Sequence, residues 1–245
     1  HSRRAKVWSA LGQAKHAFAD AHGALSVAQQ LAAADPESPA RQLMPAGIYM
    51  LLSQLQLDAM QFEAVPPTCD KASELAQAVL QRWPQHANAK LVQAFVDHSR
   101  GYNFLLRDGS GHGAQQALES FRRGLALVLE VQARQPNDVL LKRDVASFRE
   151  NIGSALHRAG DLTAAEHELR QAVVSHGEQS ANDPSNANIR LDVASSTIAL
   201  AAVRLDLGDA AEASSAASRA VALLEALPQG LRNDRFTKKT LPEGY

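Results

Sequence analysis

The chain has 245 residues, of which 45% are hydrophobic, 5% aromatic and 21% charged. This apolar fraction is normal for a folded protein and excludes wholesale disorder. The 25 basic and 26 acidic residues leave a formal net charge of −1, so no bulk charge draws the chain to nucleic acid or to an anionic membrane. The single cysteine, Cys69, excludes a disulfide framework and a cysteine-rich zinc site.

No stretch approaches the roughly 18 apolar residues that a membrane-spanning helix needs. We therefore expect no membrane insertion by this fragment. The sequence does not begin with Met and shows no signal-peptide pattern. These features suggest a piece of a longer protein, with His1-Ser2 as the remnant of a tag.

Prolines mark an internal repeat. Pro36, Pro84, Pro136 and Pro184 follow one another at nearly equal steps along the chain. The segment 144–147, Asp-Val-Ala-Ser, recurs unchanged at 192–195, after the same step that separates Pro136 from Pro184. Residues of several kinds share one offset, which predicts a protein built from repeated units.

Each repeat is expected to contain two antiparallel helices. In the repeat between Pro136 and Pro184, Gly160 is suited to end the first helix and Asp161 to begin the second. No segment alternates polar and apolar residues with a period of two, so strands are not expected. The sequence thus predicts an all-α fold, a right-handed α-solenoid of about five helix pairs. The expected pairs span residues 5–36, 39–84, 86–136, 137–184 and 186–228.

The regularity of the repeats is expected to vary along the chain. We expect residues 1–113 to form degenerate pairs, with pair two interrupted by Pro45 and by Pro66-Pro67. Residues 114–228 are expected to form regular long-helix pairs, and residues 229–245 a polar C-terminal tail that rests on the last pair, the groove or a neighbouring chain.

The N-terminal residues carry a family signature. Trp8, Leu11 and Gly12 are followed by Ala24 and Pro36. Their spacing resembles that of the tetratricopeptide repeat (TPR), whose unit has about 34 residues. One added heptad in each helix lengthens this unit to the step seen between the prolines and keeps the face of each helix in register.

Later copies fit the same pattern. Gly153, Ala165 and Ala172 fall at TPR positions, and Phe121 stands where the family has an aromatic residue. Together with the segment 183–186, Asp-Pro-Ser-Asn, they resemble the long-helix TPR modules of bacterial membrane-tethered serine/threonine protein kinases. They are also similar to modules of bacterial transcription regulators. The resemblance covers roughly residues 5–227.

The TPR resemblance implies a superhelix whose concave groove is lined by the first helix of each pair. Ordinary solvated surface is the alternative interpretation for each position considered singly. The family's groove positions fall on Lys6, Ser9, Gln13 and His16 in pair one, on Tyr102 and Asn103 in pair three, on Ser147, Glu150, Ser154, His157 and Arg158 in pair four, and on Ser195, Ile198, Ala202, Leu205 and Asp206 in pair five.

Catalytic, phosphate-binding and metal-binding patterns are not found. The glycine-rich segment 107–113 follows no strand and carries no Lys-Ser or Lys-Thr, so it is interpreted as a flexible connection between helices. The nine histidines complete no three- or four-ligand set. Cys69 has no evident histidine partner. We expect no enzyme activity, no metal and no cofactor.

A series of cations recurs with the prolines. Lys90, Lys142 and Arg190 each lie six residues after a repeat proline. Such a series could bind phosphate or an acidic peptide. The preferred interpretation is that the long side chains cover apolar surface between repeats.

The resemblance implies a non-catalytic module that binds a protein or peptide, as the sensory or scaffolding part of a bacterial signalling protein. A kinase-linked module would be extracytoplasmic, in the periplasm; the alternative location is the cytoplasm. Two other functions stay open. One is a homodimer through the Ala/Ser-rich segment 210–227. The other is an RNA-binding α-solenoid, which the balanced net charge disfavours; we expect no nucleic-acid partner.

Overall fold

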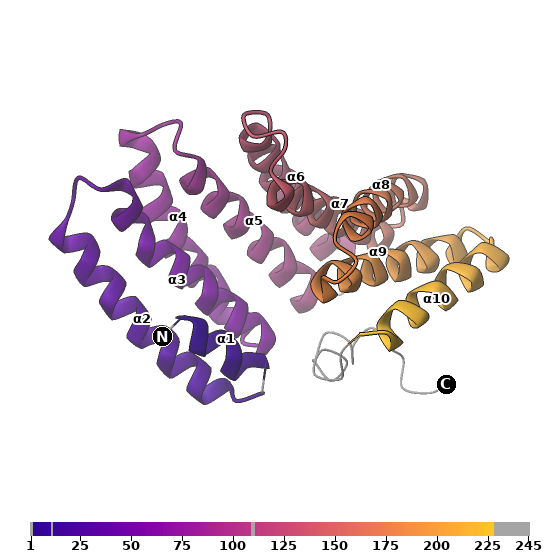
Figure 1. The fold of residues 1–245 in the computed structure, drawn as a ribbon, viewed down its shortest axis with the longest axis horizontal. Helices are drawn as coiled ribbons and strands as arrows, with labels where there is room; N and C mark the ends of the chain where they lie inside the picture. Colours follow the sequence, from indigo (N-terminus) through magenta and orange to yellow (C-terminus); the bar gives the residue numbers. More distant parts are fainter. Residues whose placement is uncertain (1, 11, 109–110, 228–245) are drawn as a thin grey trace. The chain divides into compact units, whose positions relative to one another are not determined.

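The computed structural model describes residues 2–10, 12–108 and 111–227; the predicted tail lies outside the described residues. Within those ranges the protein is helical throughout, with one short 3-10 helix and no strands (Figure 1). The α-helices are α1 (Ser2–Ala10), α2 (Ala14–Ala34), α3 (Pro39–Asp58), α4 (Val65–Arg82), α5 (Ala87–Arg107), α6 (Gly111–Gln132), α7 (Val139–Ala159), α8 (Leu162–Asn182), α9 (Ala187–Asp206) and α10 (Ala210–Glu225), and the 3-10 helix is Phe62–Ala64.

The helices follow one another as the five predicted pairs, α1–α2 to α9–α10. The chain divides into two compact units: residues 1–109 and 119–134 form one, and residues 110–118 and 135–245 the other. In the first unit α1 packs on α2, α2 on α3, α3 on α4 and α4 on α5. In the second unit α7 packs on α8, α8 on α9 and α9 on α10. The prediction of an all-α helical repeat of antiparallel pairs is confirmed.

A common turn ends the first helix of pairs one, two, four and five. Gly12, Gly160 and Gly208 have φ angles of 71°, 87° and 88°, and Met60 has φ 57°. The Gly160 N–H donates to the carbonyl of residue 157 at 3.0 Å, and the next N–H reaches back to residue 156 at 3.0 Å. The same two bonds close the turns at the other three positions. Glycine is favoured here because it adopts positive φ without steric cost.

This turn shows that the first helix of pair one ends earlier than the TPR resemblance implied. Gly12 does not lie inside the first helix, because α1 ends at Ala10 and Gly12 adopts the turn conformation. Gln13 is the N-cap of α2, and His16 lies within α2. The placement of Gln13 and His16 on the first helix is therefore wrong. The sequence pattern was misread because a glycine that fits a TPR position inside a helix fits a helix end equally well.

The repeat prolines lie two residues before the N-cap of an odd-numbered helix. The caps of α3, α5, α7 and α9 are Ser38, His86, Asp138 and Asn186, and each side chain accepts a hydrogen bond from a backbone N–H in the first turn. A cap of this kind satisfies donors that have no partner within the helix. The proline step is thus the step between helix starts.

Two expected irregularities are absent from the described residues. Helix α3 is continuous through Pro45, which is buried within it. Pro66 and Pro67 lie in the first turn of α4, where a missing N–H leaves no helical bond unmade. The expected interruption of pair two is wrong. The glycine-rich connection is also short, because α5 extends to Arg107 and α6 begins at Gly111.

The core is organised around small residues in the second helices. Two columns of small side chains recur at one constant step from pair to pair, and every member is buried. Small side chains allow helices to approach closely, which explains why the repeat retains them. The columns are Ala21, Cys69, Ala117, Ala165 and Ala213, and Ala28, Ala76, Gly124, Ala172 and Ala220.

Candidate functional site

The odd-numbered helices of each unit lie next to one another. Helix α3 contacts both α1 and α5 in the first unit, and α7 contacts α9 in the second. Side chains of successive first helices can therefore meet. This arrangement is required for a shared binding surface, and it brings several of the predicted residues together.

Polar contacts join α7 to α9. The Ser195 hydroxyl donates to Glu150 Oε1 at 2.5 Å, and Arg143 Nε donates to Asp192 Oδ2 at 2.5 Å. At the other end of the helices, His157 Nε2 lies 2.7 Å from an Asp206 carboxylate oxygen. We call these six residues the α7–α9 seam: Arg143, Glu150, His157, Asp192, Ser195 and Asp206.

The first unit repeats one of these contacts. The Ser9 hydroxyl of α1 donates to Asp58 Oδ2 of α3 at 3.3 Å. Ser9 lies three residues before the turn glycine of its pair, as His157 does, and Asp58 and Asp206 both lie two residues before the next turn. Equivalent positions in both units thus link consecutive first helices.

The other predicted residues differ in exposure. Ser147, Ser154 and Ile198 are half-buried, and Lys6, Arg158, Ala202 and Leu205 are exposed. Leu205 is 58% exposed, so the end of α9 presents an apolar side chain beside the acidic Asp206.

Asn103 does not lie on this face. It is 3% exposed, and it stands at the same distance after the N-cap of its helix as Leu55, Ala155 and Val203 do in other repeats. These three residues are buried too. The assignment of Asn103 to a groove is therefore wrong. Helical phase shows why: Asn103 follows Tyr102 directly, so the two side chains point to different sides of α5.

His176 of α8 was missed by the sequence analysis. Its side chain is fully buried, and its Nδ1 lies 3.4 Å from the Ser196 hydroxyl and 3.9 Å from Glu150 Oε2. His176 is a single histidine in a second helix, and no pattern in the sequence indicates that it packs behind the α7–α9 seam.

Burial changes the proton affinities of this region. Burial raises the pKa of Glu150 to about 7, with Asp192 adding to the rise and the hydrogen bond from Ser195 opposing it. Burial also lowers the pKa of His176 and raises the pKa of Asp144 to about 6. In each case the charged form is disfavoured because water is excluded.

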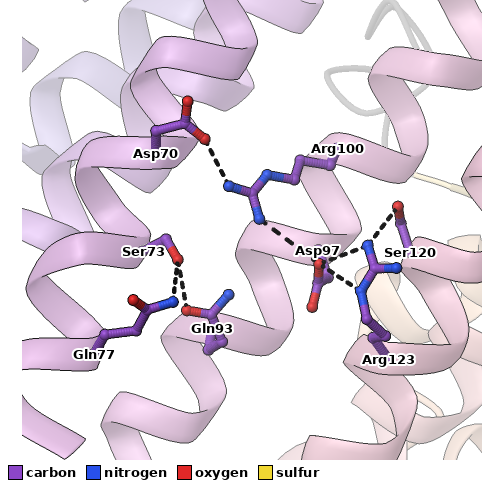
Figure 2. A network of polar contacts seen from close by, with 8 residues as sticks. All are labelled: Asp70, Ser73, Gln77, Gln93, Asp97, Arg100, Ser120 and Arg123. Carbon is purple, nitrogen blue, oxygen red and sulfur yellow. Dashed lines mark hydrogen bonds and ion pairs between the residues drawn. The ribbon is translucent and has the colours of Figure 1, made fainter. Parts of the chain in front are cut away.

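The first unit contains a second polar network, which Figure 2 shows from close by. Asp97 of α5 accepts hydrogen bonds from Arg123 of α6 at 3.2 and 3.4 Å, and Arg123 also donates to Ser120 at 3.1 Å. Arg100 spans from Asp97 to Asp70 of α4, with its bond to Asp70 at 2.7 Å. The two guanidinium groups are thus neutralised by two carboxylates, and the network ties three helices together.

Aromatic side chains lie next to this network. The rings of His98 and Tyr102 lie 6.0 and 5.7 Å from the ring of Phe121, and Phe95 is 6.2 Å from His98. Burial lowers the pKa of His98 to about 4. Phe95 and His98 precede Tyr102 by seven and four residues, so helical spacing from Tyr102 could have identified them.

A shallow depression of about 400 Å³ lies between α7 and α8. Val145 and Val174 contribute apolar surface to it, and Arg149 and Arg170 contribute cations. Arg149 is already paired with Glu168 at 2.9 Å, and Arg170 with Glu166 at 2.6 Å. The depression therefore has no cation reserved for an anionic ligand.

The cation series proves to be structural at two of its three positions. Lys90 is 8% exposed and pairs with Glu130 and Gln85. Arg190 donates to the carbonyl of residue 226, which follows α10. Lys142 is exposed.

The described part of the chain holds no cluster suited to a metal ion, because no three His, Cys, Asp or Glu side chains within it gather closely enough to ligate one. Among the helices that the structure describes, none combines the length and the apolar character required to span a bilayer.

Comparison with known proteins gives a likeness of fold. Neither a protein-family model nor a curated protein matches the chain. A similar solved structure is that of BtubC (BKLC) from P. vanneervenii, with 17% sequence identity and a TM-score of 0.51 over 87% of this chain and 91% of that chain. At this identity the likeness concerns the fold alone.

Proposed function

We propose that this protein is a non-catalytic helical-repeat module of TPR type that binds a protein or peptide segment along its odd-numbered helices. The observation that supports this most is a contact between neighbouring first helices that recurs in both units, between Ser9 and Asp58 and again between His157 and Asp206. A stack of such helices presents side chains at a regular spacing, which suits an extended or helical segment of a partner.

The composition of the surface supports peptide binding over nucleic-acid binding. The described cations of the seam and of the Asp97 network are paired with carboxylates, as Arg143 is with Asp192 and Arg123 with Asp97. Phosphate binding requires unpaired Lys or Arg side chains. The half-buried serines and the exposed Leu205 are better suited to hydrogen bonds and apolar contacts with a peptide.

A displayed library of random peptides tests the proposal. Peptides that the chain enriches would be measured against Ser154→Arg on α7 and against the matched control Ser218→Arg on α10, where Ser218 is exposed. We expect the change on α7 to weaken binding at least tenfold and the control to leave it unchanged. Enrichment of no peptide, or equal loss in both variants, would contradict the proposal. Loss of a dimer in Ser218→Arg alone would favour self-association through α10.

We further propose that the module belongs to a bacterial signalling protein, with a kinase-linked sensor outside the inner membrane as the leading form. The support is the long-helix TPR resemblance of the repeats. Determining the coding sequence on either side of the fragment tests this. A kinase domain and one hydrophobic span of about 20 residues would support a periplasmic sensor. A soluble protein without either would identify a cytoplasmic scaffold.

A further inference from the structure

We propose that Glu150, His176 and Ser195 form a proton-operated latch that holds α7, α8 and α9 together. With its proton bound, the latch is neutral and hydrogen-bonded; when the proton leaves, a buried negative charge loosens the packing of α9. This inference goes beyond the proposed function and does not depend on it, because it requires no ligand.

The geometry places a carboxyl group among three helices without a cation of its own. Glu150 of α7 is 17% exposed at its side chain, and its close partner is the Ser195 hydroxyl of α9 at 2.5 Å. His176 of α8 lies behind it, fully buried, with Nδ1 3.9 Å from Glu150 Oε2. The cation of the seam, Arg143, is already bound to Asp192.

The surrounding charges oppose ionisation of Glu150. From α9, Asp192 faces it and adds negative charge. From α8, His176 is held in its neutral form because burial lowers its pKa. On α7 itself, Asp144 also has a raised pKa, of about 6. Burial therefore raises the pKa of Glu150 to about 7, within the range in which small changes of pH alter its charge.

The sign of the effect follows from linkage. An acid whose pKa is higher in the folded than in the unfolded state stabilises the fold at low pH, and this contribution is lost as the pH rises through the folded pKa. His176 acts in the opposite sense, because its lowered pKa costs stability as the pH falls below its ordinary value. A variant that changes Glu150 but keeps His176 shares the effect of His176 with the wild type. The difference in stability that develops between the two proteins from pH 6 to pH 8 therefore reports the release of the proton from Glu150.

Amide hydrogen exchange of the full chain tests the latch. Glu150→Gln keeps the shape and the neutral charge of the protonated group at every pH. For each amide of α9, the equilibrium constant for opening in the wild type is divided by that in Glu150→Gln. We expect this ratio to rise about tenfold between pH 6 and pH 8. Glu168→Gln is the matched control, because Glu168 lies in the same unit but is paired with Arg149; its ratio should stay constant. Amides of α3 and α4 in the other unit give an internal reference.

Two results would overturn the latch: a constant ratio for Glu150→Gln, or an equal rise for Glu168→Gln. If Glu150→Gln does not fold, a ¹³C titration of the side-chain carboxyls in the wild type decides. One glutamate that titrates near pH 7 would support the latch, and glutamates that all titrate below about pH 5.5 would refute it.

Discussion

Gly101 of α5 lies directly against the ring of Phe121 in α6: a Cβ built on Gly101 would be only 2.7 Å from the ring atoms Cδ1 and Cζ. The next pair repeats this relationship, since a Cβ on Gly153 of α7 would be 2.5 Å from Cγ of Leu169 in α8. In both pairs the glycine stands seven residues before the C-cap of its helix, and the large side chain stands four residues after a small buried alanine. Close approach of the two helices therefore requires glycine at these positions.

Replacement of Gly101 by alanine tests this requirement. We expect Gly101→Ala to lower the free energy of unfolding by about 1–3 kcal/mol, because the methyl group forces the Phe121 ring out of a filled core. The control is Gly47→Ala in α3, where Gly47 is exposed and a Cβ meets nothing within 4 Å. That change should raise stability by up to about 1 kcal/mol through helix propensity. Urea unfolding followed by tryptophan fluorescence reports both, since Trp8 and Trp83 belong to the same unit. Equal effects of the two substitutions would show that the Phe121 contact is not tight.

The turn at Met60 offers a stabilising substitution. Met60 has φ 57° where the equivalent positions carry glycine, and a non-glycine residue in this conformation costs about 1 kcal/mol. We expect Met60→Gly to stabilise the protein by up to about 1 kcal/mol in the same urea experiment. The neighbouring Gln61 has φ −87°, so Gln61→Gly should destabilise instead. A gain from both variants would mean that chain flexibility, not the turn, is responsible.

Cys69 is expected to be chemically inert in the folded protein. It is fully buried in the column of small residues, and burial raises the pKa of its thiol to about 11. The thiolate is the reactive form, so a thiol reagent at pH 8 should label Cys69 only after addition of denaturant. Cys69→Ala should cost little stability, because alanine occupies the equivalent positions. Cys69→Leu should cost about 1–3 kcal/mol. Rapid labelling of the native protein would contradict this assignment.

The Asp97 network predicts different costs for two substitutions. Burial raises the pKa of Asp97 although Arg123 and Arg100 oppose the rise. Asp97→Asn keeps an oxygen acceptor for Arg123 and should cost less than about 1 kcal/mol. Asp97→Ala removes the acceptor that Arg123 and Arg100 share and should cost about 1–3 kcal/mol, because hydrogen bonds to charged groups are stronger than neutral ones. The raised pKa also means that the contribution of Asp97 to the free energy of unfolding declines as the pH rises. The free energy of unfolding of Asp97→Asn should therefore depend less on pH than that of the wild type. Urea unfolding at two pH values measures both effects.

The sequence predicted the helix pairs because their signals are local. A proline two residues before each cap, a glycine at a helix end and a small residue in each second helix act through backbone conformation and packing at fixed positions. These signals recur at nearly equal steps, so the number of pairs and their approximate limits followed from spacing. Spacing alone did not place Gly12, because a glycine there fits both a TPR position inside a helix and the end of a helix. Only its φ angle distinguished the two.

The candidate site was predicted only in part. Glu150, His157, Ser195 and Asp206 were identified because the groove positions implied by the TPR resemblance fall on them. His176 was not, because its approach to Glu150 depends on how α8 packs behind α7 and α9. Asn103 was misplaced because neighbouring residues of a helix differ by about 100° in direction. The sequence alone therefore determined the repeat, its helices and their caps, which depend on interactions between residues close along the chain. The tertiary structure decided which side chains are buried and which charges meet, because burial and proton affinity depend on contacts between helices far apart in the sequence.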